Sequence, residues 1–255
     1  MLQDKILKID NLKSELANSR PLEPEQLNSL KKMFDVELTY NSNAIEGSTM
    51  DYNETKIILL DGITIGGKST REHLEVINHK EAIDYIEEIA KKETKEIKRT
   101  DILGIHRIIL RSIDTPNAGK YRLYDVYVNR GNGEKFHFPA PALIENLMDN
   151  FILWLDENKD MHPVLLSAEA HYRLVSIHPF IDGNGRTARL LMNLILLQHG
   201  LPPAIIKNSK RKEYIEAIQS SNENNMDSFY NCIIDAETES LELYLETIKN
   251  NILWK

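Results

Sequence analysis

The sequence predicts an all-α fold, a single bundle of helices that carries one small β-hairpin on its surface. Apolar residues recur at the spacing of helices in most segments of the 255-residue chain. One stretch, 121–138, instead alternates apolar and polar residues around the turn-forming run 130–133, which is typical of a two-stranded hairpin. No repeat, low-complexity segment or long linker divides the chain, so we expect one domain spanning residues 1–255.

The composition excludes several classes of protein. Hydrophobic residues make up 42% and charged residues 27% of the chain, as in ordinary soluble proteins. The net charge of −8 argues against a nucleic-acid partner, because broad binding to nucleic acid needs a basic face. A single cysteine, Cys232, rules out an internal disulfide framework. The N-terminus is charged, unlike a signal peptide, and the longest apolar run, 190–197, is too short for a membrane span. We therefore expect a cytoplasmic protein with no membrane partner.

Helix signals in the first half of the chain are apolar spacing and capping residues. Residues 23–46 contain no glycine and are followed by Gly47, a natural stop. Ser69 and Glu72 form a capping-box pattern for a second helix, and Thr100 can cap a third. The apolar positions expected to be buried in the first two helices include Leu27, Leu30, Phe34, Leu38, Leu74, Ile77, Ala82, Ile83, Ile86 and Ile89.

The second half continues the helical pattern. One predicted helix begins at Pro141, and residues 164–177 form another that is predicted to be largely buried. The stretch 186–199 is apolar almost all round, which places it at the centre of the bundle. Two further helices are expected over 209–221 and from Asp227 to near the C-terminus.

The segment 178–189, HPFIDGNGRTAR, carries the chemistry. Pro179 ends the helix that arrives at His178, and two glycines flank Asn184, so the backbone there can take up positive φ angles. A new helix then begins near Arg186. Free amides at a helix N-terminus, with the helix dipole behind them, form an anion-binding site.

The side chains of this segment fit a polyanionic ligand. Arg186 and Arg189 oppose the usual preference for acidic residues at a helix start, which favours a bound polyphosphate over a stabilising role. Asp182 is a hard oxygen ligand beside the expected phosphates, suited to Mg²⁺. His178 has the chemistry of a general base near pH 7. Together these residues predict transfer of a phosphoryl-type group to a hydroxyl.

The segment resembles the signature of the Fic family, HPFx[D/E]GNGRxxR, at every specified position. The resemblance implies the Fic fold, with a core over 98–222 and the hairpin 121–138 as a flap over the active site. It implies a protein adenylyltransferase that moves AMP from ATP to a hydroxyl side chain of a target protein. The implied partner is therefore a protein whose Ser, Thr or Tyr docks on the flap by main-chain pairing.

The resemblance also implies a role for each matching position. His178 would deprotonate the target hydroxyl, Asp182 would hold Mg²⁺ between the α- and β-phosphates, and Phe180 would anchor the loop. The nucleotide-binding positions would be the phosphate cradle Gly183, Asn184, Gly185 and Arg186, the γ-phosphate ligand Arg189, and, by a looser match near the adenine, Tyr214, Ile218 and Asn222.

A second stretch, SNAIEG at 42–47, resembles the inhibitory motif [S/T]xxxE[G/N] of Fic proteins whose inhibitory helix precedes the core. Here that region would be 23–47. Ser42 and Glu46 are four residues apart and lie on one helix face. The resemblance implies that Glu46 pairs with Arg189 and prevents this arginine from binding the γ-phosphate. We therefore expect the isolated protein to be autoinhibited.

Other functions are compatible with the same residues. One is a hydrolase that removes AMP from a modified protein, with Glu46 positioning a water molecule. A second is a transferase of a different nucleotide-derived group, and a third is a non-catalytic nucleotide-binding regulator whose flap binds a partner. Self-modification is compatible with the transferase interpretation, and the long C-terminal helix allows a homodimer.

Overall fold

The computed structural model describes residues 2–19, 23–129, 133, 135–221 and 225–250, and within them it confirms the all-α fold class. The α-helices are α1 (Leu2–Asn18), α2 (Pro24–Ile45), α3 (Tyr52–Asp61), α4 (Thr70–Ala90), α5 (Arg99–Ile109), α6 (Ile144–Glu157), α7 (Pro163–Ile177), α8 (Asn184–Gln198), α9 (Arg211–Ser220) and α10 (Asp227–Lys249). Short 3₁₀ turns, Pro141–Leu143 and Asn208–Lys210, precede α6 and α9. The only strands in these ranges are β1 (Tyr127–Asn129) and β2 (Lys135–His137).

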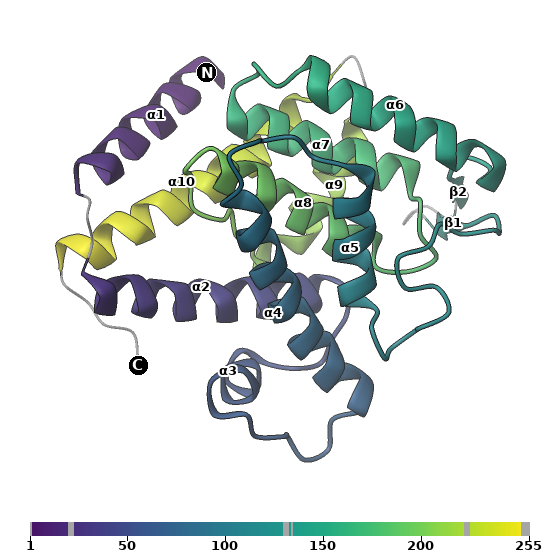
Figure 1. Ribbon diagram of the computed structural model, residues 1–255, viewed down its shortest axis with the longest axis horizontal. Coiled ribbons are helices and arrows are strands. Elements are labelled where there is room, and N and C mark those ends of the chain that lie inside the picture. The colour runs from purple at the N-terminus through teal and green to yellow at the C-terminus, as the bar shows by residue number, and fades with distance from the viewer. Residues whose placement is uncertain (1, 20–22, 130–132, 134, 222–224, 251–255) are drawn as a thin grey trace.

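Helix α8 lies at the centre of the bundle, as its apolar sequence predicts. It packs against α7, α4 and α5, and Figure 1 shows these helices surrounding it. Nearly every residue of α8 is buried, including the polar ones in its first turn. Burial of an apolar helix on all sides is the main source of stability for such a bundle. The first turn of α8 is therefore held in a fixed place.

The remaining helices form layers around this centre. Helix α2 packs against α4 and α3, and α10 runs between α1 and α2 in Figure 1, with α1 lying along it. Isoleucine and leucine side chains of α1, such as Ile9 and Leu16, are buried against this part of the bundle. Within the described residues, no helix has the length and apolar character needed to cross a membrane.

Three expectations about individual helical residues are wrong. Helix α5 starts at Arg99, so Thr100 is not its cap; instead the Asp101 carboxylate accepts a hydrogen bond from the Lys98 amide at 2.8 Å. Leu27 and Ile77 are 45% and 40% exposed, although their spacing predicts burial. Both lie at the margin of an apolar stripe, where spacing alone does not decide which side chains reach a neighbouring helix.

The hairpin is shorter than its alternating pattern predicts. Its two strands pair antiparallel over three residues each, with Tyr127 opposite His137 and Asn129 opposite Lys135. The segment before β1 is irregular, and most of the turn at 130–133 lies outside the described residues. Side chains of both strands are exposed, so the hairpin stands out from the bundle.

Candidate functional site

The turn between α7 and α8 has a shape fixed by buried contacts. His178 caps α7 with φ of 50°, a left-handed conformation that is uncommon for residues other than glycine. Phe180 is completely buried, as predicted. The Asn184 side chain accepts a hydrogen bond from the Phe180 amide at 3.0 Å and donates one to the Phe180 carbonyl at 2.9 Å. In this state the Asn184 side chain shapes the turn, and its contact with phosphate stays a prediction.

The N-terminus of α8 presents backbone amides at the end of this turn. Gly183 is the N-cap residue, with φ of 79°. The Thr187 amide donates to the Gly183 carbonyl at 2.9 Å, which begins the helical ladder. The amides of the first turn before Thr187 have no carbonyl of their own helix to bind. The Gly183 amide itself donates to the Asp182 carboxylate at 2.6 Å. A helix N-terminus favours a bound anion, and contact of these amides with phosphate stays a prediction.

His106 on α5 packs against the turn, a role that the sequence does not reveal. Its Nδ1 accepts a hydrogen bond from the Gly119 amide at 2.9 Å, so its Nε2 carries the proton and donates to the Asp182 carbonyl at 3.0 Å. Its ring stacks on Phe180 with centroids 3.6 Å apart. An isolated histidine on a buried helix face belongs to no motif, so only the tertiary structure identifies it.

His178 lies at the junction of the turn and the hairpin. Its ring stacks on Phe138, which follows β2, with centroids 3.8 Å apart. Burial lowers the pKa of the His178 imidazole to about 4, because the charged form loses its hydration. The imidazole is therefore neutral at pH 7, the protonation state of a general base.

Asp182 belongs to a closed ring of four charged side chains. Its carboxylate accepts from Arg71 at 2.9 Å and contacts Arg186 at 3.4 Å. Glu75 completes the ring, at 3.1 Å from Arg71 and 3.4 Å from Arg186. Arg71 and Glu75 come from the start of α4, and nothing in their own sequence indicates that they contact the turn. Arg186 is 3% exposed, so it faces the turn and not bulk solvent.

Arg189 is buried and held by the end of α2. Its guanidinium donates to the Glu46 carboxylate at 2.7 Å, to the Ser42 hydroxyl at 3.0 Å and to the Ser42 carbonyl at 2.9 Å. The pairing of Glu46 with Arg189 that the sequence predicts is thus present. A Cβ atom added to Gly185 would clash with Glu46 Oε1, so the carboxylate packs directly on the first turn of α8. Glu46 therefore lies between Arg189 and Gly185, beside the N-terminus of α8.

The three residues predicted near the adenine differ in their surroundings. Tyr214 is 1% exposed; its hydroxyl lies 2.8 Å from His171 Nε2 and 3.4 Å from an Arg189 nitrogen. Ile218 is partly buried on α9, and Asn222 lies outside the described residues. In this state Tyr214 supports Arg189, and contact of Tyr214, Ile218 and Asn222 with a base stays a prediction.

The donor set at the turn fits a magnesium ion that arrives with a polyphosphate. Among the described residues no three His, Cys, Asp or Glu side chains gather into a metal cluster. Asp182 alone supplies a carboxylate on the turn, and its side chain is 45% exposed. Magnesium commonly binds through one or two carboxylates, with water and substrate phosphates as the other ligands. One accessible carboxylate beside an anion site meets that requirement.

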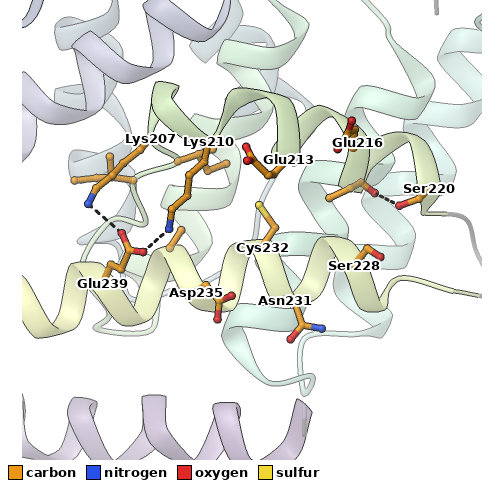
Figure 2. A pocket seen from close by; sticks show the side chains of 14 residues that line it. Lys207, Lys210, Glu213, Glu216, Ser220, Ser228, Asn231, Cys232, Asp235 and Glu239 are labelled. Carbon is orange, nitrogen blue, oxygen red and sulfur yellow. Dashed lines mark hydrogen bonds and ion pairs between the residues drawn. The ribbon is translucent and has the colours of Figure 1, made fainter. Parts of the chain in front are cut away.

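A hollow of about 610 Å³ lies elsewhere, between α9 and α10. Figure 2 shows Lys207 and Lys210 reaching Glu239 across it, at 3.0 and 2.5 Å. Burial raises the pKa of the Cys232 thiol in this hollow to about 11, so the thiol stays protonated. No residue of the 178–189 segment lines the hollow, and its lysines are already paired. The candidate site is therefore the α7–α8 turn.

Comparisons with known proteins identify the family of the chain. Residues 96–196, which include the turn, match the model of the Fic/DOC family. The chain is 36% identical over 246 residues to the protein adenylyltransferase Fic of Culex quinquefasciatus and 40% identical over 209 residues to that of Aedes aegypti. These alignments cover 95% and 81% of this chain. The chain spans about half the length of these curated relatives, 48% and 41%.

Solved structures give the same result. A Fic domain-containing signaling protein from Bacteroides thetaiotaomicron has a TM-score of 0.91 at 29% identity, with 97% of this chain and 99% of that chain covered. A segment of Fic-1 from C. elegans has a TM-score of 0.86 at 30% identity, with 98% and 74% covered. The fold of the chain and the sequence around the turn therefore both match Fic proteins. The chain belongs to the Fic/DOC family.

Proposed function

We propose that this chain is a protein adenylyltransferase, held inactive by Glu46, that transfers AMP from ATP to a hydroxyl side chain of a target protein. One observation carries the proposal: a neutral imidazole, His178, stands at one side of a helix N-terminus whose amides and guanidinium are covered by a carboxylate of the same chain. The name of the relatives, protein adenylyltransferase, supports the same activity.

The proposed reaction uses His178 as the base. The imidazole takes the proton of the target Ser, Thr or Tyr hydroxyl, and the hydroxyl oxygen forms a bond to the α-phosphorus of ATP. The bond between this phosphorus and the oxygen that bridges to the β-phosphate breaks, and pyrophosphate leaves. The amides of Gly183 and Gly185 and the guanidinium of Arg186 would stabilise the charge on the phosphates.

Two other groups complete the proposed site. Asp182 would hold Mg²⁺, which neutralises phosphate charge when it is bound. Arg189, once freed from Glu46, would bind the γ-phosphate through its paired N–H donors. The exposed strands β1 and β2 offer main-chain groups that would align an extended segment of the target.

The proposal is tested by the fate of two labels. The Glu46→Gly variant is incubated with a mixture of soluble cell proteins and with ATP labelled at either the α- or the γ-phosphate. We expect protein to gain the α-label and not the γ-label. Gain of the γ-label would indicate a kinase, and no protein label with either would contradict transfer. Release of AMP from an already modified protein, without transfer, would favour the hydrolase.

The pH dependence of transfer is a separate prediction. The folded pKa of His178 is lowered to about 4, so the base loses activity only as the pH falls towards 4. An ordinary imidazole with a pKa of about 6.5 would be mostly protonated at pH 6. We therefore expect the rate of the Glu46→Gly variant to stay within about twofold between pH 8 and pH 6. A fall with a midpoint near pH 6.5 would show that His178 is not the buried base described above.

Removal of Arg71 should favour binding of magnesium. Arg71 pairs with the Asp182 carboxylate in a partly exposed ion pair, which a metal ion must displace. Exposed pairs contribute about 0.2–1 kcal/mol, so Arg71→Ala should lower the Mg²⁺ concentration needed for ATP binding by up to about fivefold. Titration calorimetry in the Glu46→Gly background measures this. Arg111→Ala, which removes a surface pair with Glu81, is the matched control. Weaker ATP binding would instead show that Arg71 contacts the nucleotide.

A further inference from the structure

Arg122, between α5 and β1, is a buried cation whose side-chain hydrogen bonds, among the described residues, go to backbone carbonyls, while the Asp125 carboxylate acts on it electrostatically. It is 3% exposed, and burial lowers its pKa because the charge loses hydration. A buried charge is costly unless hydrogen bonds replace its water. Its guanidinium has such bonds, and all three acceptors are backbone carbonyls.

These carbonyls belong to two parts of the site. Nε donates to the carbonyl of His178 at 2.8 Å. The other two nitrogens donate to Tyr124 at 2.8 Å and to Pro139 at 2.6 Å, the residues that lead into and out of the hairpin. The backbone amide of Arg122 adds a bond to the Pro179 carbonyl at 2.9 Å. One residue thus joins both ends of the hairpin to the turn.

The bond to His178 falls at a strained position. The left-handed conformation of His178 is unfavourable for a residue with a side chain, and persists only where its surroundings hold it. Arg122 fixes the carbonyl of this residue, while Phe138 fixes its ring by stacking. Phe138 precedes Pro139, whose carbonyl binds the same guanidinium. The imidazole and the outgoing end of the hairpin are therefore held by one connected set of contacts.

We propose that Arg122 is a positioning residue that fixes the hairpin relative to the His178 imidazole, so that a hydroxyl aligned on the hairpin meets the base. This inference rests on the proposed function. Arg122 contacts the start of the turn, at His178 and Pro179, and not the first turn of α8, and among the described residues its side-chain donors bind backbone carbonyls. It therefore acts on alignment and not on nucleotide binding. A lysine keeps the charge but has one nitrogen in place of a rigid fork of three, and it cannot hold three separated carbonyls in the same geometry.

The experiment compares Arg122→Lys and Arg122→Gln with their parent, all carrying Glu46→Gly, and uses Arg111→Gln as a surface control. Transfer of AMP from α-labelled ATP into a fixed amount of soluble cell proteins gives the rate at saturating ATP and the KM for ATP. Misplacement of the hairpin relative to the imidazole should lower the rate of transfer roughly 10- to 100-fold in both Arg122 variants, with an unchanged KM for ATP. A normal rate in Arg122→Lys would overturn the proposal, because charge alone would then suffice.

Hydrogen exchange gives a second measurement that does not depend on activity. Backbone amides at both ends of the hairpin, 123–129 and 135–138, should exchange roughly tenfold faster in the Arg122 variants than in the parent. Peptides from α10 serve as an internal reference, since they would change only if the whole protein were destabilised. Unchanged exchange at the hairpin would overturn the proposal. If the parent transfers no label, the proposed function fails, and the exchange data still decide whether Arg122 holds the hairpin.

Discussion

Replacing Glu46 with glycine should raise the affinity for ATP roughly 10- to 150-fold and turn on transfer of its α-phosphate to protein. The carboxylate binds the buried Arg189 guanidinium at 2.7 Å and packs against Gly185. It therefore occupies both the N–H donors of Arg189 and the space that a triphosphate would need. Charge-assisted hydrogen bonds of this kind contribute about 1.5–3 kcal/mol. Removing the acid also removes its repulsion of the γ-phosphate. Titration calorimetry with ATP and labelling with α-labelled ATP measure the two effects.

Two further variants separate the causes. Glu46→Gln keeps the size of the side chain and removes its charge. A gain in ATP affinity equal to that of Glu46→Gly would assign the inhibition to charge repulsion, and a small gain would assign it to steric blocking. Asp61→Gly is the matched control, because Asp61 is an exposed acidic residue at the end of α3, followed like Glu46 by a glycine. It should bind ATP no better than the original protein. Equal affinity of Glu46→Gly and the original protein would contradict autoinhibition by Glu46.

The features that the sequence predicts well are those set by neighbouring residues. The turn after His178 follows from Pro179, from Gly183 with its positive φ and from the apolar helix behind them, all within one short segment, whereas Gly185 already lies in the helix without a positive φ. The burial of α8 follows from its own composition. The pairing of Glu46 with Arg189 joins residues 143 positions apart, and only the resemblance of both segments to family motifs predicts it.

The features that the sequence misses are long-range contacts of ordinary residue types. Arg71 reaches Asp182 across 111 positions, and Arg122 reaches the His178 carbonyl across 56. Nothing in the local pattern of an arginine shows which backbone or carboxylate it will meet. The sequence does carry one signal for helix α3, because Asp51 and Glu54 form a capping box like that of Ser69 and Glu72. The apolar run of this helix is too short to show a clear helical period.

Replacing His178 with alanine in the Glu46→Gly background should lower the rate of transfer roughly 10²- to 10⁴-fold, the usual contribution of a general base. Binding of ATP should change little, because the imidazole lies on the hairpin side of the turn, stacked on Phe138, while the anion-binding amides belong to the first turn of α8. Rapid-quench labelling gives the rate, and titration calorimetry gives the affinity. The combination of normal affinity and lost transfer would assign His178 to the chemical step.

The outcome also separates enzyme from regulator. His199→Ala is the matched control, since His199 is a partly buried histidine at a helix end whose ring hydrogen-bonds the Ile195 carbonyl of its own helix. It should transfer label at the parent rate. Retention of transfer by His178→Ala would remove this imidazole from the mechanism. A loss of transfer together with a loss of ATP binding would instead mean that His178 maintains the shape of the turn, through its left-handed backbone and its carbonyl on Arg122.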